Sequence, residues 1–124
     1  MNKLVFFLFP LFLFAQWIKF PYTIELKKDE VANFEVHYDK RIYPLTLRWT
    51  LFKNDILTLH YKYNDFPRQI TLYKNPPLNT FRIKIANYPE LYPYFLIEFT
   101  DFNDKIATFR IYLFNGKKVK VKRQ

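Results

Sequence analysis

The densest group of chemically active side chains lies at the end of the chain. It consists of five cations: Lys117, Lys118, Lys120, Lys122 and Arg123. Because alternate residues of a β-strand point to the same side, a strand here would place Lys118, Lys120 and Lys122 on one face. Such a row binds phosphates, lipid head groups or other polyanions. It would equally protect an edge strand from pairing with another molecule, and both interpretations stay open.

A second group combines tyrosines with prolines in the irregular stretch 87–94, whose sequence is NYPELYPY. Its members are Tyr88, Pro89, Tyr92, Pro93 and Tyr94. Tyrosine offers a large contact area with a polar tip and is enriched at protein interfaces, and proline restricts the backbone. This composition predicts a loop that contacts another protein. The alternative is a loop folded over the end of the core.

Further cations occupy the polar positions of predicted strands: Arg48, Lys62, Arg82, Lys84 and Arg110. If those strands share one sheet, these residues form a basic face, beside which His60 and Tyr112 could stack on bases or sugars. A solvent-exposed sheet face accounts for the same residues. The aromatic spacing is not that of an RNA-recognition sheet, which argues against a nucleic acid partner.

Residue types needed for catalysis are scarce. The chain has no cysteine and no serine, which excludes disulfides, thiolate zinc sites and both common nucleophiles. His37 and His60 lie on polar strand positions without a neighbouring nucleophile, so we expect exposed structural histidines. Asp101, Asn103 and Asp104 resemble the start of a calcium loop but lack its glycine and distal glutamate. The single glycine excludes glycine-rich phosphate loops.

These exclusions predict a protein without enzymatic activity, cofactor or metal. A hydrolase that uses two carboxylates, such as Glu35 and Glu98, is the one enzymatic alternative. Nothing in the spacing of the acidic residues pairs any two of them.

The segment Met1–Ala15 has the plan of a signal peptide. Lys3 supplies a positive start, Leu4–Phe14 is apolar, and Ala15 is small enough for cleavage, although Leu13 is larger than usual at its position. We therefore expect export to the periplasm or the exterior. The absence of cysteine also excludes a lipid anchor on that residue.

Two alternatives remain for this segment. The apolar run is shorter than the roughly 20 residues of a membrane span, but Trp17 and Ile18 extend it, so an uncleaved anchor in the inner membrane is possible. A buried N-terminal strand is the other.

The remaining residues, 16–124, form one predicted domain. Hydrophobic and polar residues alternate through about nine segments, as in Leu45, Leu47 and Trp49. Turn residues separate the segments at roughly 8–12-residue intervals. The pattern predicts an all-β fold, a single antiparallel β-sandwich of 8–9 strands. The alternative is a closed antiparallel β-barrel, which would hold an apolar ligand.

One stretch indicates the kind of sandwich. Ile24–Val36 contains a strand, a polar turn and a second strand, and it resembles the opening of many immunoglobulin-like sandwiches. Val31, Phe34 and Tyr38 also fit a helix face with Asp29 as its N-cap, but the alternation favours a strand.

Proline, asparagine and aspartate must make most of the turns. Asn115-Gly116 is the strongest hairpin signal, and Asn64–Pro67 is a second predicted turn.

Composition limits the function further. The net charge is +9, and removing Lys3 with the leader leaves 19 basic and 11 acidic residues, or +8. Together with the tyrosine loop, this charge predicts a non-catalytic binding or accessory module of a bacterial-type cell envelope, whose partner is another envelope protein. The alternatives are a binder of an anionic membrane surface or polyanion, and a carrier of an apolar ligand.

Overall fold

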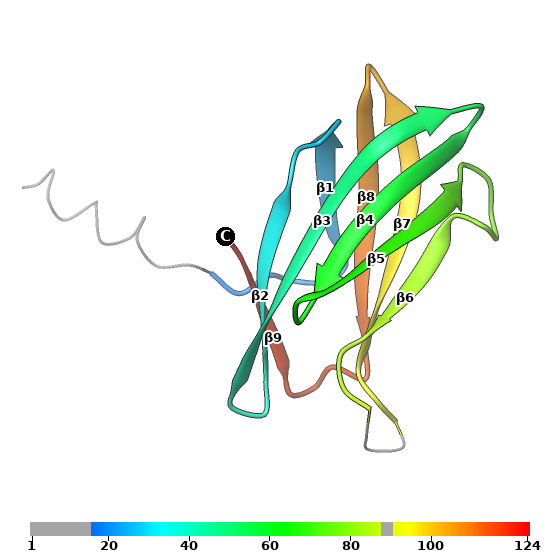
Figure 1. The fold of residues 1–124 in the computed structure, drawn as a ribbon. Coiled ribbons are helices and arrows are strands. Elements are labelled where there is room, and N and C mark those ends of the chain that lie inside the picture. The colour runs from blue at the N-terminus through cyan, green and yellow to red at the C-terminus, as the bar shows by residue number, and fades with distance from the viewer. Residues whose placement is uncertain (1–15, 88–90) are drawn as a thin grey trace, which may run out of the picture.

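The computed structural model describes residues 16–87 and 91–124, which form nine β-strands and no helix. The strands are β1 (Tyr22–Lys27), β2 (Ala32–Tyr38), β3 (Arg41–Lys53), β4 (Ile56–Tyr63), β5 (Phe66–Tyr73), β6 (Thr80–Lys84), β7 (Tyr94–Asn103), β8 (Ile106–Phe114) and β9 (Val119–Arg123). Figure 1 shows them in two facing layers. The predicted all-β sandwich is confirmed. The leader Met1–Ala15 lies outside the described residues.

Two antiparallel sheets make the sandwich, one with the strand order β1-β8-β7-β6 and one with the order β5-β4-β3-β2-β9. The consecutive strands β5 and β6 belong to different sheets and do not pair. The sheets therefore do not close into the barrel that was the alternative. Immunoglobulin constant domains use a different strand order, so the likeness to them lies in the two-sheet architecture.

Both sheets turn their apolar positions inward because side chains alternate along each strand. In β3 the burial pattern places Leu45, Leu47 and Trp49 in the core and leaves Arg48 exposed. Aromatic rings fill the space between the layers, with Phe99 packed against Phe109 at 5.6 Å between ring centroids. Segment 32–38, for which a helix was considered, is strand β2, paired with β3 and β9.

Four hairpins turn without glycine. Their two central residues are Asp39-Lys40, Asn54-Asp55, Asn64-Asp65 and Asp104-Lys105, all with positive φ between 51° and 69°. Positive φ at both positions defines the type I′ turn, whose twist matches that of the flanking strands. Asparagine and aspartate tolerate this conformation at the first position, but lysine at the second position is strained.

The strain at Lys105 leads to a testable expectation. Lys105→Gly should raise the free energy of unfolding by about 0.5–1 kcal/mol, because glycine adopts positive φ without a Cβ penalty. Urea denaturation would measure the gain. Lys105→Ala is the control, since it removes the charge and keeps the Cβ. A midpoint for Lys105→Gly equal to or below that of the control would contradict the assignment.

Two predicted turns differ in the structure. Phe66 and Pro67 belong to β5, which is an edge strand, where a proline does not cost a ladder hydrogen bond. Asn115-Gly116 does not make a hairpin, because the strands on either side of it lie in different sheets. Gly116 has no positive φ, and a Cβ there would overlap the side chain of Leu113. The glycine at position 116 is therefore explained by the close approach of the Leu113 side chain, which leaves no room for a Cβ.

Candidate functional site

The basic C-terminal residues divide between a turn and a strand. Lys117 and Lys118 lie in the turn before β9, so Lys118 is not part of the predicted strand row. Lys120 and Lys122 lie in β9 with their side chains on its outer face. Arg123 donates a hydrogen bond from Nη1 to the Tyr22 hydroxyl at 3.2 Å.

The outer edge of β9 is covered by the chain that precedes β1. Trp17 forms an antiparallel bridge with Lys122, and the Ile18 amide donates to the Val121 carbonyl at 2.8 Å. The Trp17 ring lies 4.6 Å from Nζ of Lys122 and 5.5 Å from Nζ of Lys120, both within cation–π range. Sequence analysis did not include this tryptophan among the candidates, because only the pairing of distant segments brings it to the lysines.

A carboxylate beside this cluster is held by two hydrogen bonds. His37 Nε2 lies 3.1 Å from Oε1 of Glu35, and Gln124 Nε2 donates to Oε2 at 2.7 Å. The hydrogen bond with His37, followed by that with Gln124, lowers the pKa of Glu35 below its usual value. The Glu35 carboxylate is therefore stabilised in its charged form and ties the end of the chain to β2.

Stability should consequently depend on the charge of Glu35. A lowered pKa in the folded state adds stability above the ordinary carboxylate pKa of about 4.3, and this gain disappears as the pH falls through the folded-state value. Glu35→Gln should lower the unfolding free energy at pH 7 by less than about 1 kcal/mol, since the pair is partly exposed. The difference from the wild type should vanish in acid. Urea titrations at several pH values would measure it, with the exposed Glu25→Gln as control. Equal losses from both variants at pH 7 would contradict this role.

The tyrosine–proline group is only partly described. Tyr88 and Pro89 lie outside the described residues. Pro93 is buried, which fits the alternative of a segment folded over the core. Tyr92 and Tyr94 are half-buried, and Tyr94 begins β7.

These two tyrosines belong to a larger surface on the outer side of the four-stranded sheet, here called the aromatic face. It consists of Tyr92, Tyr94, Leu96, Tyr112 and Phe114, with Arg82 and Lys84 at its border. The strand register produces it: Tyr94 lies opposite Phe114, and Leu96 lies opposite Tyr112. Phe114 and Leu96 were not sequence candidates, because their neighbours become known only once the strands are paired.

The rings of the aromatic face contact one another. Tyr94 stacks on Phe114 with 5.2 Å between centroids, and Tyr92 and Tyr112 extend the row at 5.7 Å and 6.3 Å. Arg82 lies over the Tyr94 ring at 4.7 Å. Lys84 lies over the Tyr92 ring at 4.5 Å. Phe114 is 42% exposed, so the row is accessible to a partner.

The five strand cations predicted as one basic face lie on both sheets. Arg82, Lys84 and Arg110 belong to the four-stranded sheet, whereas Arg48 and Lys62 belong to the five-stranded one. The single face is therefore wrong, because consecutive strands change sheet between β5 and β6.

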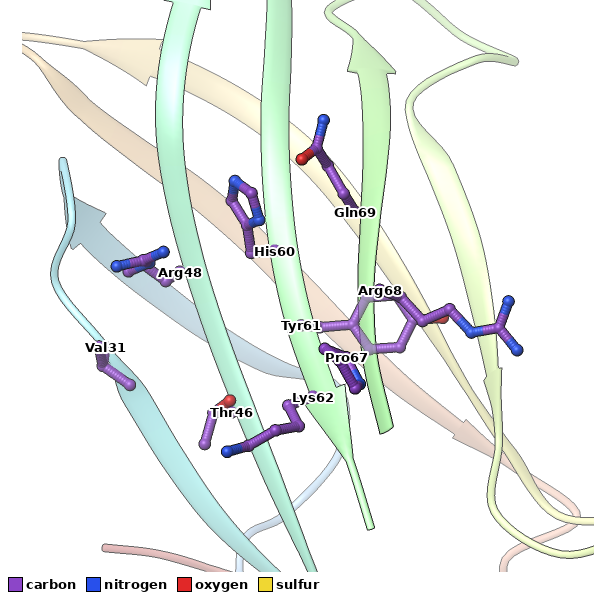
Figure 2. Close-up of a pocket in the computed structure, with 9 residues that line it drawn as sticks. All are labelled: Val31, Thr46, Arg48, His60, Tyr61, Lys62, Pro67, Arg68 and Gln69. Carbon is purple, nitrogen blue, oxygen red and sulfur yellow. The ribbon is translucent and has the colours of Figure 1, made fainter. Parts of the chain in front are cut away.

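Arg48 and Lys62 line a hollow of about 600 Å³ on the five-stranded sheet, drawn in Figure 2. His60 lies on β4 opposite Arg48, and its Nε2 is 3.0 Å from the Thr50 hydroxyl. The lining residues include no aspartate or glutamate.

The residues that resemble the start of a calcium loop make a local turn. The Phe102 amide donates to Oδ1 of Asp101 at 2.8 Å. Within residues 16–87 and 91–124, no three potential metal ligands come together.

Comparison with known protein families, curated proteins and solved structures finds no match to this chain. In the described part of the chain, no helix is long and apolar enough to cross a membrane.

Proposed function

We propose that this domain is a non-catalytic binding module that docks another protein of the cell envelope through its aromatic face. The observation that carries the proposal is the continuous row of rings from Tyr92 to Tyr112, bordered by Arg82 and Lys84. Tyrosine and arginine are enriched among the residues that dominate binding energy at interfaces. A flat sheet face holds such residues rigidly, so little conformational entropy is lost on binding.

The test compares three forms of the protein. The wild type, the face variant Tyr94→Ser/Phe114→Ser and the control Tyr73→Ser/Phe66→Ser are used to capture partners from envelope extracts. The control removes the same two residue types from β5 on the other sheet, where they are 43% and 68% exposed. A partner should be retained by the wild type and the control and lost by the face variant.

The captured partner is then purified and titrated against each form. The face variant should bind about 30-fold or more weakly, which corresponds to the loss of at least one dominant contact. Equal affinity of the face variant and the wild type for every captured partner would contradict the proposal.

A second candidate function is binding to an anionic membrane surface through Trp17, Lys120 and Lys122. Tryptophan and lysine together are typical of membrane interfaces, and the cation–π geometry places them side by side. Lys120→Gln/Lys122→Gln should weaken binding to phosphatidylglycerol vesicles, and binding should fall with salt. Removing the whole basic segment is a poor test, because Val119 and Val121 are buried. Unchanged vesicle binding by the double variant would exclude this function.

The alternative function, a carrier of an apolar ligand, required the interior of a closed barrel, and the two sheets do not close into one. A cavity lined by Ile18, Phe20 and Phe95, among other apolar side chains, holds about 10 Å³, roughly the room for one water molecule.

A further inference from the structure

We propose that the hollow on the outer face of the five-stranded sheet is a binding site for a tetrahedral oxyanion, the phosphate or sulfate ester group of a small ligand. This site is separate from the aromatic face, which lies on the other sheet. The groups that would bind the anion are Arg48, His60, Lys62 and Gln69, and Val31 and Pro67 bound the hollow.

Strand pairing brings the polar groups into two adjacent rows. Arg48 lies opposite His60, which lies opposite Gln69. Lys62 occupies the next position on the same face of β4. Directly opposed side chains have their Cβ atoms about 4.5–5.5 Å apart, so the rows form one patch of hydrogen-bond donors. Figure 2 shows these residues on neighbouring strands, with the Arg68 guanidinium directed away from them toward β6.

A β-bulge fixes the central residue of the patch. The register between β3 and β4 shifts between Trp49 and Leu51, which leaves Thr50 as the extra residue. Bulges redirect side chains and are common next to functional sites. Here the Thr50 hydroxyl bonds to His60 Nε2 at 3.0 Å and thereby sets the orientation of the imidazole ring.

The charges of the patch are not neutralised by the protein. In residues 16–87 and 91–124, no lysine or arginine lies within 4 Å of an aspartate or glutamate oxygen, and the one contact of that length joins His37 and Glu35. Arg48 therefore has no acidic partner within that distance, and its diagonal neighbour on β4 is Lys62, a second cation. Placing like charges close together is unfavourable, and a bound anion would remove that cost.

The donor set indicates the kind of anion. A guanidinium group binds phosphate or sulfate oxygens in a bidentate way, and an ammonium group adds a point charge. The Gln69 amide and the His60 ring add further hydrogen-bonding groups. A hollow of about 600 Å³ has room for the organic part of an ester beside the anion.

Pyrophosphate is the probe for the test. It is titrated into ¹⁵N-labelled protein at constant ionic strength, and the amide and side-chain signals of His60 and Gln69 are followed. Saturable shifts confined to the hollow are expected, with a dissociation constant of about 1 mM from two charge-assisted contacts. Arg48→Gln and Lys62→Gln should each weaken binding by about tenfold, and both side chains are exposed, so the variants should fold.

The control is Lys117→Gln/Lys118→Gln, which removes two exposed positive charges from the turn before β9, outside the hollow. The proposal is wrong if this control weakens binding as much as the hollow variants do. It is equally wrong if the signals of the hollow do not respond to 20 mM pyrophosphate.

Vesicles distinguish the two sources of the anion. If phosphatidic acid vesicles bind the wild type and not Arg48→Gln, the ligand is a lipid head group. If vesicle binding is the same for both while pyrophosphate binding differs, the ligand is a soluble ester. Loss of pyrophosphate binding in the hollow variants would leave the aromatic face and its partner unaffected, so this proposal and the proposed function fail separately.

Discussion

Replacing Phe99 by alanine is expected to lower the free energy of unfolding by about 3–5 kcal/mol. Phe99 is fully buried and contacts Phe109 and Phe52, at 5.6 Å and 6.0 Å between ring centroids. Its removal leaves a cavity between the sheets that the paired backbones cannot collapse to fill. Since small domains have total stabilities of about 5–15 kcal/mol, a large unfolded population should appear in mild urea. Fluorescence of Trp49 would follow the transition.

Two further variants calibrate this result. Phe99→Leu keeps most of the buried volume and should cost clearly less than the alanine variant. Phe66→Ala removes an equally large ring that is 68% exposed, and it should change stability by no more than about 0.5 kcal/mol. A Phe99→Ala loss as small as that of Phe66→Ala would mean that the packing described for the core is wrong.

Trp49→Ala is the second substitution with a large expected effect, again about 3–5 kcal/mol. Trp49 belongs to β3 in one sheet, and its indole Nε1 donates to the Leu26 carbonyl of β1 in the other sheet at 2.7 Å. Its own carbonyl accepts from the Asp29 amide at 2.9 Å, and its ring packs on Phe102 at 5.4 Å. The residue therefore joins the two layers by both packing and hydrogen bonds.

Trp49→Phe separates these two contributions. Phenylalanine keeps most of the apolar contact but leaves the buried Leu26 carbonyl without a donor, which should cost about 1–3 kcal/mol. Denaturation followed by circular dichroism measures both variants, because both of them lack the Trp49 fluorophore. If Trp49→Phe were as stable as the wild type, the hydrogen bond to Leu26 would have no net role.

The sequence was sufficient to predict the elements of this fold. Strict alternation, as in Leu45, Leu47 and Trp49, is local information, and it places the inward side chains of a strand correctly whatever its neighbours are. The same local pattern assigned β2 as a strand. The predicted turn Asn64–Pro67 was too long, since only Asn64-Asp65 turns the chain and Phe66 and Pro67 belong to β5. The edge position that accommodates this proline is not visible in local sequence.

The candidate site depended on pairing, which alternation does not encode. Tyr92 and Tyr94 were identified by their composition, but Phe114 joins them only through the register of β7 with β8. Trp17 reaches Lys122 in the same way, across nearly the whole chain. Arg48 and Arg82 lie on different sheets because the chain passes from one sheet to the other after β5. The sequence of the loop between β5 and β6 does not indicate this change of sheet.

The pairing of early strands with late strands has a consequence for the synthesis of this protein. The first strand pairs with the eighth, and the last strand pairs with the second. Until residues 106–123 have been synthesised, the four-stranded sheet lacks the inner strand that joins β1 to β7, and the five-stranded sheet lacks its last strand, β9. Contacts so distant in sequence slow folding. A nascent chain of this protein should therefore expose unpaired strands that chaperones can protect until residue 123 has left the ribosome.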